Sequence, residues 1–135
     1  MKDPNCLFCK IIDGIVPSFR IYEDEQAFAF LDINPFEEGH CLVVPKYHAE
    51  MLPGLPEEVF VGFSHAIHRT AKLVKEKLGA DGFNILQSNG KCATQVIPHV
   101  HFHIIPRWNS RALNWSPRVG TGMDVLADLQ RRIAG

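Results

Sequence analysis

The sequence predicts a single α+β domain. Its 135 residues fall within the size range of one domain, and they contain neither internal repeats nor a linker. Short segments rich in aromatic and β-branched residues alternate with polar turns, a pattern typical of antiparallel strands. One long segment, 56–78, instead repeats apolar residues at three- and four-residue spacing, which indicates an amphipathic helix. We therefore treat residues 1–135 as one domain.

The first third of the chain predicts an antiparallel meander behind a short N-terminal knuckle. Residues 18–22 and 27–31 have strand composition and are separated by a polar turn. A loop with Asn-Pro and Gly punctuation follows at 32–39, and residues 40–44 form a short strand that ends at Pro45.

The helix predicted over 56–78 opens with proline and ends at Gly79. Two further strands are expected. One covers residues 82–87, and the other contains residues 100–105 and extends over about 98–106. The remaining residues, 107–135, form a tail and a closing helix at about 123–133.

Composition excludes several classes of function. Lysine and arginine number 14 against 15 acidic residues, so the chain lacks the basic excess typical of duplex-binding proteins, and no nucleic-acid partner is expected. No apolar run reaches the roughly 18 to 20 residues that span a bilayer, and the N-terminus does not resemble a signal peptide. A cytoplasmic location without membrane partners is expected. Thiols stay reduced there, so the four cysteines are interpreted as ligands, reactive groups or core residues.

Three histidines alternate with apolar residues at positions 99, 101 and 103. In a strand such residues share one face, with about 6.5 to 7 Å between successive members. A surface strand with polar residues outward would be the simplest interpretation, but three histidines in register favour a site around one phosphate or metal. Imidazole serves both purposes, as a ligand of a catalytic metal or as a nucleophile toward phosphorus.

The segment from His99 to Ile105 resembles the signature of the histidine triad (HIT) family, and the similarity extends over about residues 6 to 107. Residues 30–35, 39–46, 89–90 and 95 fall in the order and spacing of that family. The resemblance implies a histidine-triad-like fold: a five-stranded, mainly antiparallel sheet with the long helix packed on it and a C-terminal helix at its end. It also implies a homodimer formed through the long helix and an edge of the sheet.

In proteins of this family the middle histidine attacks the α-phosphorus of a nucleotide, and water then cleaves the nucleotidyl-imidazole. The resemblance assigns this role to His101, places His103 near the scissile phosphate, and gives His40 and His99 supporting roles. Histidine rather than glutamine at 103 favours hydrolases over the galactose-1-phosphate uridylyltransferase branch. Expected substrates are nucleotide phosphoramidates or dinucleoside polyphosphates with a purine nucleotide retained, and no metal takes part in catalysis.

The resemblance also assigns a nucleotide site. Asp32 matches the carboxylate that binds ribose hydroxyls, although an Asp before Asn-Pro also suits a simple turn. Many relatives have Gly-Gln-Ser/Thr before the triad strand where this chain has Thr94, Gln95 and Val96, so a hydroxyl at 96 and a glycine at 94 are missing. The full expected set is Asp32, Ile33, Asn34, Asn89, Thr94, Gln95 and Val96.

Cys6 and Cys9 have the spacing of half a tetrahedral zinc site, which alone is weak evidence. His48 and His99 match positions that some bacterial relatives use with the cysteine pair, so the resemblance implies a structural zinc held by these four residues. In the alternative, the cysteines are reduced thiols, His48 is a surface turn residue, and His99 supports the triad only through hydrogen bonds.

Two other functions remain open. The three-histidine strand could belong to a metallohydrolase that uses it as a zinc site, but no HExxH or HxxxDH pattern accompanies it. The chain could also bind nucleotides without turning them over. His65 and His68 lie on the polar side of the predicted long helix and are expected to be solvated, and Cys41 is expected to be buried.

Overall fold

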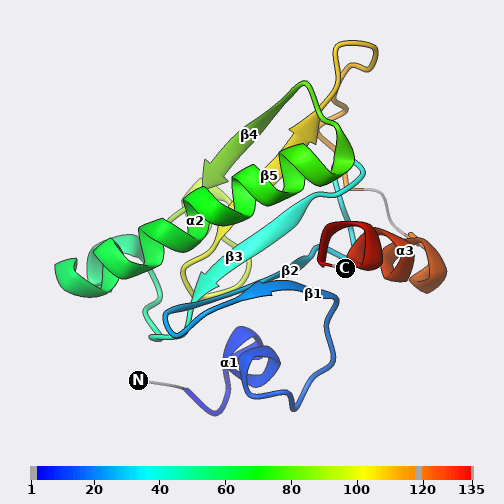
Figure 1. Ribbon diagram of the computed structural model, residues 1–135. Coiled ribbons are helices and arrows are strands. Elements are labelled where there is room, and N and C mark those ends of the chain that lie inside the picture. Colours follow the sequence, from blue (N-terminus) through cyan, green and yellow to red (C-terminus); the bar gives the residue numbers. More distant parts are fainter. Residues whose placement is uncertain (1–2, 118–119, 135) are drawn as a thin grey trace.

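The computed structural model describes residues 3–117 and 120–134 and confirms the predicted α+β fold with a five-stranded antiparallel sheet (Figure 1). The strands are arranged in the order β1-β2-β3-β5-β4, so β1 and β4 are the edges. Their bounds are β1 Arg20–Glu23, β2 Ala27–Leu31, β3 Cys41–Pro45, β4 Gly82–Gln87 and β5 Phe102–Arg107.

The two faces of the sheet are covered by different helices. Helix α2, Glu57–Leu78, crosses one face, where Val43 and Ile104 share a buried cluster with Phe63 and with residues of α3, Met123–Ala134 (Figure 1). On the other face, Phe30 and Leu42 belong to a second cluster that includes the short helix α1, Leu7–Ile12. Every residue of β2 and β3 is therefore buried, because these central strands have no solvated face.

The long helix follows the prediction to within one residue. Pro56 is its N-cap, and Gly79 ends it in a left-handed conformation with φ +65°. The Gly79 N–H donates to the carbonyl of Glu76 and the Ala80 N–H to that of Lys75, so two carbonyls of the last turn are satisfied. His65 and His68 are exposed, as predicted.

Two elements near the candidate site differ from those predicted from the sequence. The N-terminal knuckle contains helix α1, which is too short to show apolar periodicity and whose first turn is capped by the Cys6 sulfur, 3.3 Å from the Cys9 nitrogen. Strand β5 begins at Phe102 rather than at about 98 or 100. The Val100 N–H donates to the carbonyl of Ala49, in the loop after β3, so this part of the chain lies outside the β3–β5 ladder.

Smaller shifts occur at two other strands. β1 is found at 20–23 rather than 18–22, and β3 at 41–45 rather than 40–44. None of the helices in residues 3–117 and 120–134 combines the length and the apolar composition that a membrane span requires.

Candidate active site and metal centre

The three signature histidines do not form one cluster. His103 lies in β5 opposite Leu42, on the sheet face that carries α1, while His101 precedes the strand. The rings of His101 and His103 tilt toward one another, with centroids 5.0 Å apart, closer than the spacing expected from a regular strand. His99 instead points toward the two N-terminal cysteines. The expectation that all three rings surround one phosphate or metal is therefore wrong.

The ring of His101 is held in one tautomer by the main chain. Its Nδ1 lies 2.7 Å from the carbonyl oxygen of His99. A carbonyl only accepts, so Nδ1 carries the proton and Nε2 carries the lone pair. Burial lowers the pKa of His101 below its ordinary value, which keeps the ring neutral near pH 7. His101 thus has the chemical form of a nucleophile.

A second hydrogen-bond chain fixes His40 and His103. The Phe36 N–H donates to His40 Nδ1 at 2.9 Å, so the His40 proton sits on Nε2. That nitrogen lies 2.9 Å from His103 Nδ1 and donates to it, which places the His103 proton on Nε2. Burial lowers the pKa of His40 to about 3 and that of His103 to about 4, so both rings are neutral donors.

Phe36 was not singled out in the sequence, because its contribution is a backbone N–H that no side-chain pattern reveals. Its ring also stacks on His40, with centroids 5.2 Å apart and planes 29° apart. The loop that contains Phe36 thus holds the His40 ring in place through one hydrogen bond and one ring contact.

Asp32 makes the turn expected of its position and also lies beside the histidines. Its Oδ1 accepts from the Asn34 N–H at 2.9 Å, and its Oδ2 lies 3.7 Å from His40 Nε2. Burial raises the pKa of this carboxyl above its usual range. Ile33 and Asn34, the next two residues of the expected nucleotide site, are both exposed.

Two amide side chains of the expected phosphate loop are committed to holding that loop. The Leu52 N–H donates to Asn89 Oδ1 at 2.7 Å. Gln95, 6% exposed, accepts from the Gly90 N–H at 2.6 Å and donates to the carbonyl of Glu50 at 2.6 Å. The loop is therefore anchored to the segment around residues 50–52.

Thr94 shows why a glycine suits its position. Its φ is +70°, and it is the one non-glycine residue with positive φ in the described part of the chain. That left-handed region is unfavourable for a β-branched side chain and free of cost for glycine. The Thr94 hydroxyl donates to the neighbouring Ala93 carbonyl at 2.5 Å, while Val96 is 84% exposed.

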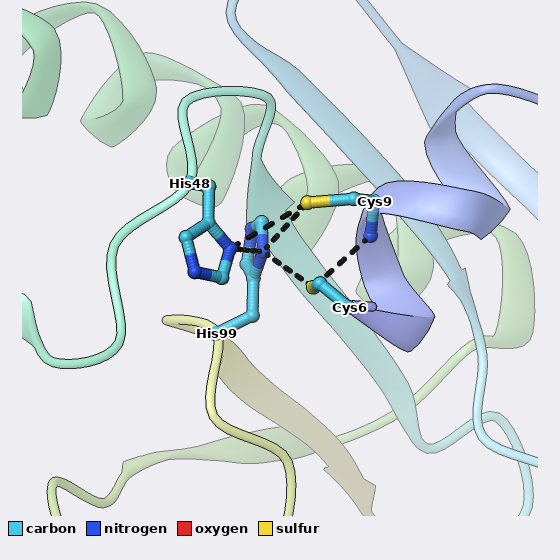
Figure 2. Close-up of side chains that lie close together, drawn as sticks. All are labelled: Cys6, Cys9, His48 and His99. Atoms are coloured by element: carbon cyan, nitrogen blue, oxygen red, sulfur yellow. Dashed lines mark hydrogen bonds between the residues drawn. The ribbon is translucent and has the colours of Figure 1, made fainter. Parts of the chain in front are cut away.

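Four donor atoms converge between α1, the loop after β3 and the segment before β5, as Figure 2 shows. Cys6 Sγ lies 3.2 Å and Cys9 Sγ 3.6 Å from His99 Nδ1. His48 Nδ1 lies 3.5 Å from Cys9 Sγ and 3.0 Å from His99 Nδ1. His48 is thus a member of this cluster and not an isolated surface residue.

This donor set fits zinc. Metal–ligand lengths of about 2.3 Å for sulfur and 2.0–2.1 Å for nitrogen place tetrahedral donors roughly 3.3–3.8 Å apart, close to the separations found here. His99 Nε2 donates to the carbonyl of Pro45 at 2.8 Å, so its Nδ1 lone pair faces the sulfurs. Burial raises the pKa of the Cys6 thiol to about 11, so a cation is needed to hold it as the thiolate that ligates metal.

The metallohydrolase alternative loses support from the same geometry. In the described residues, the groups able to hold a metal are the cysteine cluster and a set formed by Asp32, His40 and His103. Neither group contains all three signature histidines, and the second lacks His101. An ion bound by the whole three-histidine strand is therefore not what this arrangement provides.

Comparison with known proteins places the fold and site in context. The HIT domain family model matches residues 14–110. An adenosine 5′-monophosphoramidase of Saccharomyces cerevisiae is 40% identical over 134 residues, covering 97% of this chain and 82% of the yeast protein. A HIT-like protein structure from Bartonella henselae superposes with a TM-score of 0.90 at 36% identity, covering 98% of this chain and 96% of that one. A zinc-bound histidine triad family protein from Mycobacterium smegmatis does so with a TM-score of 0.82 at 39% identity, covering 96% and 94%.

Proposed function

The chain belongs to the HIT domain family, and we propose that it hydrolyses nucleotides at the α-phosphate through a covalent intermediate on His101. The observation that carries this proposal is the hydrogen bond from His101 Nδ1 to the His99 carbonyl, which leaves Nε2 unprotonated. Nucleotide phosphoramidates are the substrate class we favour, because a relative 40% identical to this chain is named an adenosine 5′-monophosphoramidase. Dinucleoside polyphosphates are the second class.

In the first step His101 Nε2 attacks the α-phosphorus, and the bond from phosphorus to the leaving nitrogen breaks. A phosphoramidate protonated on nitrogen loses a neutral amine, so no imidazole has to give up a proton. The positive charge that develops on the His101 ring is stabilised through its Nδ1–H by the His99 carbonyl. This splits one difficult displacement into two easier ones.

In the second step water attacks the same phosphorus and the nitrogen–phosphorus bond breaks, which restores neutral His101. The proton that this step releases is taken up by the free amine. His103 Nε2–H serves as a donor to the phosphoryl oxygens, and His40 holds it in that tautomer. Asp32 binds ribose hydroxyls, with Ile33 and Asn34 beside it.

The loop that contains Asn89, Thr94, Gln95 and Val96 completes the phosphate site in this proposal. The Thr94 and Gln95 N–H groups already donate to the carbonyls of Lys91 and Gly90, so we assign the phosphate contact to other backbone N–H groups of the loop, such as that of Val96. Such groups bind an anion without a lysine, in keeping with the near-neutral charge of the chain. The amides of Asn89 and Gln95 act by shaping the loop, because their hydrogen bonds are already made within the protein.

We further propose that Cys6, Cys9, His48 and His99 hold a structural zinc ion, and that the metal supplies no catalytic chemistry. The protein is proposed to act in the cytoplasm as a homodimer through α2 and β4. Exposed Phe83 and Ile85 support this assembly. Ile85 pairs with Ile104, which packs in the α2 cluster, so the exposed pair lies on the α2 side of this edge strand.

Steady-state hydrolysis of adenosine 5′-phosphoramidate tests the enzymatic assignment. Wild type is expected to release AMP, and His101→Ala to lose roughly 10³-fold or more in kcat while still binding AMP. His68→Ala, a substitution at an exposed helix position, is the matched control. Substantial turnover by His101→Ala would overturn the nucleophile, and AMP binding without turnover by wild type would identify a non-catalytic nucleotide-binding protein.

A further inference from the structure

We propose that the metal centre positions the nucleophile, so that loss of the metal lowers the catalytic rate of a protein that is still folded. This inference rests on the proposed function for its kinetic arm, but not for its spectroscopic arm. Two contacts carry it, one through the main chain of His99 and one through the side chain of Phe8.

His99 belongs to both sites at once. Its ring Nδ1 faces Cys6 and Cys9, its Nε2 donates to the carbonyl of Pro45, and its own carbonyl accepts the ring proton of His101. Its side chain is fully buried, with 0% exposure. A metal bound to Nδ1 would hold the His99 ring on the side opposite to Pro45. Because the ring and the carbonyl of His99 are joined through its Cα, the metal would also hold the carbonyl that selects the tautomer of His101.

Phe8 is the second connection. It lies on α1 between Cys6, the N-cap of that helix, and Cys9. The centroid of its ring lies 5.9 Å from that of His99 and 5.2 Å from that of His101. Both contacts are edge-on, with interplanar angles of 74° and 83°. A metal that binds Cys6 and Cys9 therefore also holds the aromatic ring that limits rotation of His101.

The coupling separates the metal ligands into two kinds. His99 is hydrogen-bonded to His101 directly. The hydrogen bonds of His48 go to Cys9 and His99 instead, so His48 and Cys9 reach His101 through the metal, His99 or α1. If the metal site were purely structural, replacing His48 would lower the stability of the protein but would leave the ring of His101 unchanged in molecules that remain folded. Positioning predicts a change in that ring.

The first arm reads the tautomer of His101 without substrate. Nitrogen-15 NMR of the zinc-loaded protein is expected to show one protonated and one unprotonated ring nitrogen for His101, assigned by its loss in His101→Ala. Removing zinc with a chelator, or substituting His48→Asn, is expected to bring the two resonances together as the tautomers exchange. His68→Asn, at an exposed helix position, is the control and leaves them apart. Far-UV circular dichroism at the same temperature establishes that the molecules observed are folded.

The second arm keeps the metal in place and changes Phe8, so that it remains informative if the zinc-free protein unfolds. Phe8→Leu is compared with Phe28→Leu, a substitution in the same buried cluster whose aromatic contact is with Phe30. Zinc content is measured for both. Phe8→Leu is expected to lower kcat by roughly 10- to 100-fold, the effect of a misplaced reacting group, and to broaden the His101 resonances, while Phe28→Leu does neither.

The outcomes are distinct. Unchanged His101 resonances in folded, zinc-free protein and in Phe8→Leu would overturn the coupling and identify the metal site as purely structural. If the zinc-free protein unfolds, Phe8→Leu alone decides in the same way. If no variant or wild type turns over nucleotide, the proposed function fails, and the NMR arm still reports whether the metal orders His101.

Discussion

The carbonyl oxygen of His99 lies 2.7 Å from Nδ1 of His101 and accepts its ring proton. The same residue turns its own Nδ1 toward Cys6 and Cys9. One residue therefore contributes its backbone to the candidate active site and its side chain to the candidate metal centre. Residues two apart in a regular strand would present both rings on the same face. Here the segment before β5 lies outside the ladder, and the rings of His99 and His101 point to different sites.

Replacing a proposed metal ligand is expected to destabilise the fold. Cys6→Ser should lower the bound zinc from about one ion per chain to a small fraction and reduce the free energy of unfolding by several kcal/mol, because a structural zinc contributes its binding energy to folding. Metal analysis and denaturant unfolding measure both quantities. Cys41→Ser is a less suitable control because Cys41 is fully buried, so Ser64→Ala on α2 serves instead. Full zinc content in Cys6→Ser would contradict the ligand assignment.

Stability is expected to fall as the pH drops below about 6.5. His40 and His103 have folded-state pKa values of about 3 and about 4, below the ordinary value of 6.5, so the unfolded chain takes up protons first. Their contribution is complete above pH 6.5 and declines by about 1.4 kcal/mol per pH unit for each group until the folded pKa is reached. His40→Gln should remove close to one proton from the slope measured by denaturant unfolding. An unchanged slope, equal to that of the exposed-site variant His65→Gln, would contradict the buried neutral His40.

Thr94→Gly is expected to stabilise the protein by about 0.5–1 kcal/mol. The substitution removes the strain of a β-branched residue at φ +70°, and this gain exceeds the entropy that glycine adds to the unfolded chain. Thermal unfolding measures the change. Ala93→Gly, at the neighbouring position without positive φ, should destabilise instead. A loss of stability in Thr94→Gly would show that the hydroxyl contact with Ala93 outweighs the strain.

The proposed homodimer gives a direct prediction in solution. Light scattering after gel filtration is expected to give about twice the chain mass of 15.2 kDa. Ile85→Lys places a charge on the exposed apolar side of β4 and is expected to shift the protein toward monomer without unfolding it. Ile15→Lys is the control, because Ile15 is also exposed but lies outside α2 and β4. A wild-type mass near that of one chain would contradict the dimer.

Much of the fold follows from local patterns. The run at 27–31 and the strand at 82–87 were predicted to the residue, and the helix over 56–78 to within one, because composition, periodicity and terminal Pro and Gly all agree there. The start of β5 was not predictable in this way. An alternating pattern continues through 99–101, but the hydrogen bond from the Val100 N–H to Ala49 belongs to a distant loop.

The candidate metal ligands and the candidate active-site histidines differ in the kind of sequence signal that predicts them. Cys6 and Cys9 show a spacing that indicates half a zinc site, yet the pairing with His48 came from family resemblance and depends on tertiary structure. The tautomers of His40 and His101 depend on the Phe36 N–H and the His99 carbonyl. Every residue has such backbone groups, so no side-chain pattern distinguishes the two that matter.

The most direct test of the proposed chemistry is intact mass spectrometry at short reaction times. Wild type and His101→Ala are each mixed with adenosine 5′-phosphoramidate and quenched within the first turnover. A transient mass increase by one adenylyl group is expected on wild type alone, mapped to His101 by fragmentation. An equal adduct on His101→Ala, or product formation by that variant at the wild-type rate, would contradict it.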